Sequence, residues 1–279
     1  MERYTILRFI CWKGIKKMMR SISNIAWPQE EDAQVYLLMK KYGYSGLEIA
    51  PTRIFPDTPY EHLEEAGRWA ERLKDQFGFV IPSMQSIWYG RSENLFASEE
   101  ERSALLSYTK QAIDFAAAIG CGNLVFGCPR NRNLPDGKKE EEAVPFFREL
   151  AAYAAERGTV IGMEANPPVY QTNFINDTAA ALRLIREVDS PGFRLNLDVG
   201  TMIYNQESVD LLRGNVRLIN HVHISEPGLK LIVRRPVHRE LYQLLKEEGY
   251  DRFVSIEMGK TESFEIIENR MEYVRNVFA

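Results

Sequence analysis

The sequence predicts a single-domain α/β protein that folds as a (β/α)8 barrel, also called a TIM barrel. Short apolar runs alternate with longer helical patterns eight times between residue 21 and the C-terminus. No linker rich in Pro, Gly or Ser divides this alternation, and strict alternation predicts a parallel sheet. The phosphate-binding patterns of open parallel sheets, GxGxxG and GxxxxGK(S/T), do not occur, so eight βα units favour a closed barrel.

The length and composition are ordinary for one globular domain of this type. The chain has 279 residues, of which 45% are hydrophobic and 27% are charged, and such barrels reach about 250 residues or more as one domain. The net charge is −4 and the pI is about 5.8. Because proteins that bind nucleic acid normally carry a basic surface, we expect no nucleic-acid partner.

The first 20 residues differ from the rest, since they carry six Lys or Arg residues and one acid. We expect residues 1–20 to form a flexible extension and residues 21–279 to form the barrel. An amphipathic helix that binds a membrane surface or a partner is the alternative for this extension. No apolar run reaches the ~18 residues of a membrane span, so none is expected. The three cysteines form no CxxC pair, which indicates a reducing, cytoplasmic setting.

Each predicted strand is a short apolar run that ends close to a polar residue, Gly or Pro. The expected strands are residues 21–26, 46–49, 79–84, 123–127, 160–164, 194–198, 218–224 and 254–257.

The predicted helices lie between the strands and carry apolar residues three or four positions apart. In the last helix these residues include Ile267, Met271 and Val274. Asp177 is placed to cap the helix that follows it. The expected helices are residues 30–42, 60–77, 99–119, 139–157, 177–188, 208–213, 237–249 and 263–278.

The last four predicted strands all end in side chains that can bind a metal. They end at Glu164, Asp198, His223 and Glu257, each about one βα unit after the one before. Side chains two residues apart on a strand point to the same side, so His221 faces the same way as His223 but lies one layer deeper. The carboxyl ends of the strands surround one mouth of a barrel, where active sites of this fold lie. We therefore expect the four endings to converge.

Three carboxylates and one imidazole form a set of mainly oxygen ligands. Such a set suits a divalent ion such as Mn²⁺, Mg²⁺ or Co²⁺, and Zn²⁺ is also compatible with it. Carboxylates crowded together without a cation would repel one another and raise a pKa. Each residue taken alone has a common structural explanation as a cap, a turn residue or a core histidine. The metal hypothesis depends on finding all four on consecutive strands.

The sequences around these strand ends resemble the xylose isomerase-like TIM-barrel superfamily. This superfamily contains sugar isomerases and epimerases of the tagatose 3-epimerase and hydroxypyruvate isomerase kinds, inosose dehydratase and AP endonuclease family 2. The resemblance covers residues 21–279. The segments that carry it are Gly-Met-Glu164-Ala-Asn-Pro, Leu-Asn-Leu-Asp198-Val-Gly, His221-Val-His223-Ile-Ser-Glu226, Ser-Ile-Glu257-Met, Gly46-Leu-Glu-Ile-Ala-Pro51 and Ser83-Met-Gln-Ser86.

The resemblance implies a divalent-metal-dependent isomerase or epimerase of a small sugar or ketose-like substrate. The metal ligands would be Glu164, Asp198, His223 and Glu257, and the same Glu164 and Glu257 would form the acid/base pair. One glutamate would remove the proton next to a carbonyl to form an enediolate, and the other would return a proton. A homodimer or homotetramer is compatible with this reading.

Several relatives carry a histidine three residues after the aspartate of the sixth predicted strand, and here Thr201 stands there. This difference leaves other activities of the superfamily open. A lyase of the inosose dehydratase type is the first alternative, and a phosphodiesterase of the AP endonuclease type is the second. The four histidines of the chain are few for a three-metal nuclease. A non-catalytic metal-binding or sensing barrel is the third alternative.

Six residues at or just past strand ends are candidates for binding substrate. Polar side chains there could contact substrate hydroxyls, and a basic side chain could bind a phosphate or carboxylate group. Helix capping, loop hydrogen bonding and simple solvation are the alternatives for each. The six candidates are Glu48, Gln85, Asn166, Glu226, Arg130 and Lys230.

Overall fold

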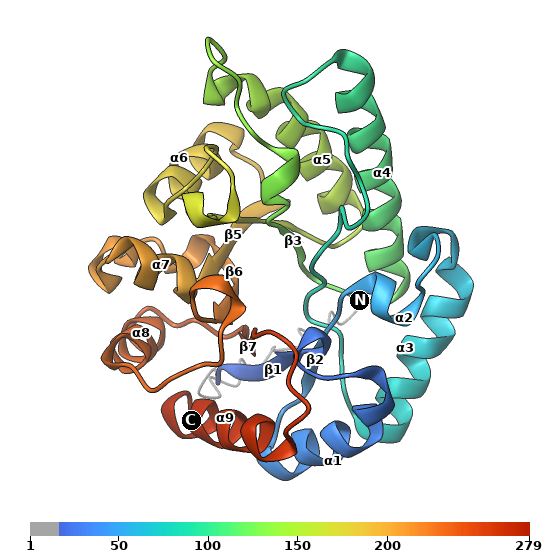
Figure 1. Ribbon diagram of the computed structural model, residues 1–279, viewed down its shortest axis with the longest axis vertical. Helices are drawn as coiled ribbons and strands as arrows, with labels where there is room; N and C mark the ends of the chain where they lie inside the picture. The colour runs from blue at the N-terminus through green and yellow to red at the C-terminus, as the bar shows by residue number, and fades with distance from the viewer. Residues whose placement is uncertain (1–16) are drawn as a thin grey trace, which may run out of the picture.

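The computed structural model describes residues 17–279 and shows a parallel sheet at the centre of a ring of helices (Figure 1). The sheet order is β2-β1-β7-β6-β5-β4-β3. The predicted single-domain α/β barrel is therefore confirmed. Its named strands are β1 (Met19–Ser23), β2 (Gly46–Glu48), β3 (Leu124–Phe126), β4 (Ile161–Glu164), β5 (Phe193–Asp198), β6 (Ile219–Ile224) and β7 (Phe253–Ile256).

The helices cover the outside of the sheet, and α9 lies against α1, so the two ends of the described chain complete the ring (Figure 1). Within the described residues, no helix is both long enough and apolar enough to cross a membrane. The α-helices are α1 (Asp32–Tyr42), α2 (Pro51–Ile54), α3 (Leu63–Phe77), α4 (Glu99–Ala118), α5 (Val144–Glu156), α6 (Thr178–Val188), α7 (Val199–Asn205), α8 (Pro236–Glu247) and α9 (Phe264–Val277).

Short 3-10 helices occur in the connections and beside some α-helices. They are η1 (Asn24–Ala26), η2 (Gln29–Glu31), η3 (Pro59–Glu61), η4 (Pro129–Asn131), η5 (Glu140–Ala143), η6 (Pro168–Tyr170), η7 (Val209–Leu212), η8 (Val216–Leu218) and η9 (Pro227–Leu229).

The third predicted strand, residues 79–84, is not a continuous strand. It contacts β2 and β3 through single bridges, which pair Gly46 with Val80, Ile49 with Met84, and Met84 with Leu124. Pro82 interrupts the segment, because proline has no N–H to donate to a neighbouring strand. Backbone hydrogen bonds from Leu47 to Val80 and from Met84 to Asn123 still join the two sides. This segment closes the barrel.

The barrel begins earlier than the predicted boundary at residue 21. Strand β1 starts at Met19, and Arg20 lies within it with its side chain buried. The Arg20 guanidinium donates to the carbonyls of Phe278 at 3.0 Å and Gly43 at 3.2 Å. Arg20 therefore joins the first strand to the C-terminal end of the chain. Residues 1–16 of the predicted extension lie outside the described part of the chain.

Two short helices, α2 and α7, were missed, and one helix was misplaced. Helix α7 (Val199–Asn205) follows β5 without any loop, and the expected helix at residues 208–213 is the 3-10 helix η7. The α7 sequence contains Gly200 and several β-branched residues, so its helical signal is weak. Asp198 starts it by accepting a hydrogen bond from Thr201 N at 2.5 Å. The cap predicted at Asp177 is confirmed, since its side chain accepts from Ala180 N at 2.7 Å.

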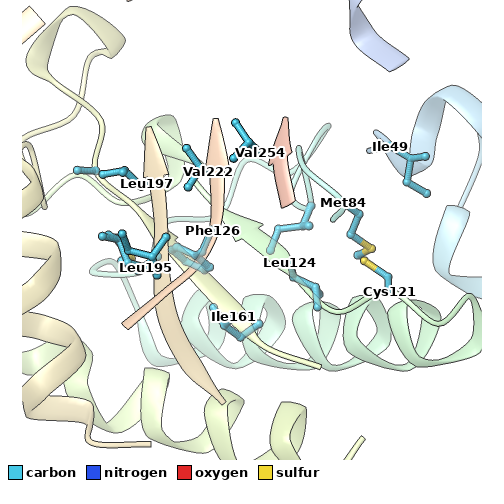
Figure 2. Close-up of a cluster of buried hydrophobic side chains, with 14 of the residues drawn as sticks. Ile49, Met84, Cys121, Leu124, Phe126, Ile161, Leu195, Leu197, Val222 and Val254 are labelled. Atoms are coloured by element: carbon cyan, nitrogen blue, oxygen red, sulfur yellow. The ribbon is translucent and has the colours of Figure 1, made fainter. Parts of the chain in front are cut away.

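The strands bury apolar side chains toward the helices and polar side chains toward the barrel interior. Leu195, Leu197, Val222 and Val254 come from three neighbouring strands and belong to one buried apolar cluster (Figure 2). Because side chains alternate along a strand, the residues between them face inward. The inward residues of β5 to β7 include Asn196, Asp198, His221, His223 and Ser255, all buried. The barrel interior is thus polar, and it leads to the candidate site.

Candidate metal centre

Four strand ends converge at the mouth of the barrel. Each of Glu164, Asp198, His223 and Glu257 offers a ligand atom within 4.8 Å of the other three, and all four are buried. His223 Nδ1 lies 3.0 Å from Glu164 Oε1 and 3.2 Å from Glu257 Oε2. The register of the sheet accounts for this meeting, because Asp198 pairs with His223 on adjacent strands β5 and β6.

The electrostatics of this cluster fit a divalent cation. Burial raises the pKa of Asp198 to about 6, and the charge of Glu164 adds to the rise. Burial also raises the pKa of Glu257 to about 7 against the opposing effect of His223. Burial alone would lower the pKa of His223, but the charges of Glu257 and Glu48 raise it well above its ordinary value. Crowded acids with raised pKa values favour a cation at this place, and the ligands must lose their protons when they bind one.

Two amide donors hold the Glu164 carboxylate. Asn196 Nδ2 donates to Glu164 Oε1 at 2.8 Å, and Asn166 Nδ2 donates to Oε2 at 3.0 Å. Arg132 Nη2 in turn donates to Asn166 Oδ1 at 2.7 Å and to the Glu164 carbonyl at 3.0 Å. In contrast, the interaction of the Glu257 carboxylate is with His223. The two glutamates thus have different surroundings.

Asp198 combines its position in the cluster with the N-cap of α7. Its Oδ1 accepts from Thr201 N at 2.5 Å and its Oδ2 accepts from the Ser225 hydroxyl. The Thr201 hydroxyl donates to the Ala165 carbonyl at 2.8 Å and is buried. Thr201 therefore joins the first turn of α7 to the segment after β4, at the place where several relatives carry a histidine.

Beneath the cluster lies a second buried group of Glu48, His221 and His223. Glu48 Oε2 lies 3.0 Å from His223 Nε2 and 2.8 Å from His221 Nε2. Gln85 Nε2 donates to Glu48 Oε1 at 3.1 Å and to the Ser23 hydroxyl at 2.6 Å. Burial alone would raise the pKa of Glu48, but His223 and His221 outweigh it and hold this pKa well below its usual range.

The predicted substrate-binding residues have varied locations. Glu48 has no exposed surface, and its carboxylate contacts His223 and accepts a hydrogen bond from Gln85, which is also buried. Glu226 is buried in a bidentate pair with Arg235, at 2.7 and 2.6 Å. Arg130 is exposed in η4, and Lys230 is exposed just after η9.

Several contributing residues were missed by the sequence analysis. Asn196 has a visible signal, because it lies two residues before Asp198 and thus on the same inward face of β5. Ser225 has the same signal, because it lies two residues after His223, whereas Asn123 precedes β3 without any signal. Arg132 follows the fourth predicted strand, and nothing in its neighbourhood predicts its burial.

A line of amides runs through the barrel interior to Glu164. Arg252 donates to Asn220 Oδ1, and Asn220 Nδ2 donates to Asn123 Oδ1 at 2.9 Å. Asn123 Nδ2 donates to Asn196 Oδ1 at 3.2 Å, and Asn196 Nδ2 reaches Glu164. An arginine can only donate and a carboxylate can only accept, so both ends require the same orientation of the amides.

Comparisons with known proteins agree with this architecture. A model of the family described as xylose isomerase-like TIM barrel matches residues 37–277. A human protein named putative hydroxypyruvate isomerase is 25% identical, over 86% of this chain and 89% of its own length. The crystal structure of 3-keto-D-glucoside 4-epimerase from E. coli has a TM-score of 0.72 and 19% identity, covering 93% of this chain and all of that one.

A second solved structure gives a similar result. D-psicose 3-epimerase from Clostridium cellulolyticum H10, solved with D-tagatose, has a TM-score of 0.74 at 17% identity and covers 94% of this chain and 99% of that one. At such identities these two structures show the fold. The family match extends over nearly all of the described chain, and the chain belongs to the xylose isomerase-like TIM-barrel family.

Proposed function

We propose that this protein is a divalent-metal-dependent isomerase or epimerase of a small sugar or ketose-like substrate. The observation that carries the proposal is the position of two glutamates next to the same histidine nitrogen. His223 Nδ1 lies 3.0 Å from Glu164 and 3.2 Å from Glu257. Membership of the family supports the proposal, as do relatives named hydroxypyruvate isomerase and sugar 3- and 4-epimerases.

Glu164, Asp198, His223 and Glu257 would hold the ion. Their three carboxylates and one imidazole suit Mn²⁺, Mg²⁺ or Co²⁺, with Zn²⁺ as a further candidate. When bound, the ion would act as a Lewis acid that polarises a substrate carbonyl and stabilises developing negative charge.

The two glutamates would carry out the proton transfer. One carboxylate removes the proton from the carbon next to the carbonyl, which gives an enediolate, and the other returns a proton. Return to the opposite face of the same carbon is epimerisation, and return to the adjacent carbon is isomerisation. Asn166 and Asn196 keep Glu164 in one orientation, whereas Glu257 contacts the imidazole that both glutamates share.

Substitution of Glu257 tests this proposal. Glu257→Gln keeps the size of the side chain and removes its acid/base function, so we expect turnover to fall by about 100-fold or more. The assay screens ketoses for exchange of a C–H for deuterium in D₂O, followed by NMR, with folding checked by circular dichroism. Glu262→Gln, a change at an exposed acid in the loop after β7, is the control and should keep wild-type turnover.

The same NMR experiment separates the proposal from its alternatives. Undiminished turnover of a folded Glu257→Gln protein would exclude this acid/base assignment. Loss of water from the substrate would instead identify a lyase of the inosose dehydratase type. For the AP endonuclease alternative, the other histidines give no support, because His62 stacks on Phe55 and His238 bonds to Tyr273 away from the cluster.

Metal analysis of the purified protein is a second test. We expect about one divalent ion per chain and its loss in a variant with Glu164 and Glu257 both changed to Gln. A folded wild-type protein that binds none of Mn²⁺, Mg²⁺, Co²⁺ or Zn²⁺ would contradict the proposal. The cytoplasmic location and a homodimeric or homotetrameric state remain predictions of the sequence.

A further inference from the structure

Arg132 is a buried cation that pairs with no carboxylate in the described part of the chain. Its side chain has no exposed surface. Its hydrogen bonds go to the Glu164 carbonyl at 3.0 Å and to Asn166 Oδ1 at 2.7 Å, with Met163 Sδ at 3.9 Å. Among the described residues, no carboxylate oxygen lies within ion-pair distance of it. Burial of an unpaired charge destabilises a fold, so this arginine requires another explanation.

The contact with Asn166 determines which way its amide faces. A guanidinium only donates hydrogen bonds, so the oxygen of Asn166 must point to Arg132. The nitrogen of the same amide therefore points to Glu164 Oε2, to which it donates at 3.0 Å. If the Asn166 amide were rotated by half a turn, its oxygen would face the Glu164 carboxylate and repel it. Arg132 thus selects the one amide orientation that supports Glu164.

The position of Glu164 Oε2 depends on its hydrogen bond from the Asn166 amide. Oε1 has Asn196 and His223 as partners, at 2.8 and 3.0 Å. On the side of Oε2, Gly127 approaches so closely that an added Cβ would lie 2.9 Å from this oxygen. A glycine offers no side-chain donor, so the Asn166 amide is the side-chain donor that fixes this half of the carboxylate.

We propose that Arg132 is a positioning residue that acts through Asn166 to hold the Glu164 carboxylate in the orientation needed by a bound metal. The inference rests on the proposed function, because it assumes that Glu164 is a ligand. It assigns Asn166 to the support of Glu164, in place of the substrate contact expected from sequence. Arg132 itself touches neither substrate nor metal.

The test is a double-mutant cycle on the dissociation constant for Mn²⁺, measured by electron paramagnetic resonance of the free ion. Arg132→Lys keeps the positive charge, but its ammonium is shorter and cannot reproduce the planar contact. Asn166→Leu removes the amide at similar volume. Because residues that support metal ligands affect affinity by about 10- to 100-fold, we expect each variant to bind Mn²⁺ about tenfold more weakly.

The double variant gives the decisive value. If Arg132 acts through Asn166, the double variant binds Mn²⁺ about as weakly as Asn166→Leu alone, since there is no amide left to orient. Asn215→Leu is the control, because Asn215 precedes β6 and contacts Arg186 and the Leu211 carbonyl, at 2.7 and 3.2 Å, away from the cluster. Its affinity should equal that of the wild type, whatever happens to its melting temperature.

Other outcomes overturn the inference. Wild-type Mn²⁺ affinity in a folded Arg132→Lys protein would do so. So would a double variant whose loss of affinity equals the product of the losses in the two single variants. If Arg132→Lys does not fold, wild-type affinity in Asn166→Leu alone is sufficient to reject the relay. Glu164→Gln separates this failure from that of the proposed function. Mn²⁺ binding that does not depend on Glu164 would contradict the proposed function, whereas dependence on Glu164 without dependence on Asn166 would contradict only the role of Arg132.

Discussion

At the scale of single residues, Glu48 determines how His223 can bind a metal. Glu48 accepts only, so His223 Nε2, 3.0 Å away, carries a proton. The nitrogen that can lose its proton to an ion is then Nδ1, which faces Glu164 and Glu257. Histidine ligands commonly donate their second N–H to a carboxylate in this way, which fixes the ring and raises its basicity. We therefore interpret Glu48 as a support for the ligand.

Glu48→Gln tests this interpretation. We expect its Mn²⁺ affinity to fall by about 10- to 100-fold, because the amide no longer requires a proton on Nε2. Titration calorimetry with MnCl₂ gives the affinity. Asp32→Asn is the control, since Asp32 pairs with Arg53 and Trp27 outside the barrel interior and should not affect metal binding. Equal affinities of Glu48→Gln and the wild type would contradict the role of Glu48.

At the scale of elements, the inward faces of the strands must leave room for the line of amides. Gly162 lies on β4 beside two of them. A Cβ at Gly162 would lie 2.5 Å from Asn123 Oδ1 and 3.1 Å from Asn196 Cβ. Such distances cannot be accommodated without a shift, and protein interiors have little free space. Gly162 thus leaves room for the Asn123 side chain to reach over β4 to Asn196 on β5.

Gly162→Ala should therefore destabilise the protein. We expect the free energy of unfolding to fall by about 1–3 kcal/mol through overpacking, as measured by urea denaturation. Gly122→Ala is the control, because the nearest atom to its added Cβ, Pro82 O, lies 3.8 Å away. Its stability should stay within about 0.5 kcal/mol of the wild type. Equal effects of the two substitutions would show that the amide line does not need this space.

At the scale of the whole molecule, the stability of the metal-free protein depends on pH through the ionisable groups at the mouth of the barrel. Burial raises the pKa of Asp198 to about 6 and that of Glu257 to about 7, so the folded state binds more protons than the unfolded state above about pH 4. The raised pKa of His223 acts in the same direction above about pH 6.5. Stability of the metal-free protein from these groups is therefore present at low pH and lost as pH rises.

A bound ion should reverse this trend. Metal ligands must lose their protons, so affinity increases with pH, and a ligand at 100 times its Kd stabilises by about 2.7 kcal/mol. We expect the difference in melting temperature between Mn²⁺ and EDTA samples to grow from pH 5.5 to pH 8. Burial lowers the pKa of His238 to about 4, but His238 lies outside the cluster and its effect cancels in this difference. A difference that shrinks as pH rises would contradict the prediction.

The sequence determined the class of fold and the strands that carry the cluster. Alternating runs with periods of about 2 and 3.6 residues reflect local backbone geometry, so they predict strands and helices well. Local signals also account for the errors. Pro82 breaks the pairing of residues 79–84, and α7 is too short and too rich in β-branched residues to be recognised. Such deviations changed the detail of the barrel without changing its class.

Only the tertiary structure decided which side chains face one another across the barrel. Strands β2 and β6 are separated in the sheet by β1 and β7, so Glu48 reaches His223 only because the sheet closes on itself. The path of the loop that buries Arg132 against Asn166 is likewise absent from any local pattern. A sequence shows which residues share a strand face or a strand end, since these depend on near neighbours. Contacts across the barrel depend on closure, and closure is a property of the whole chain.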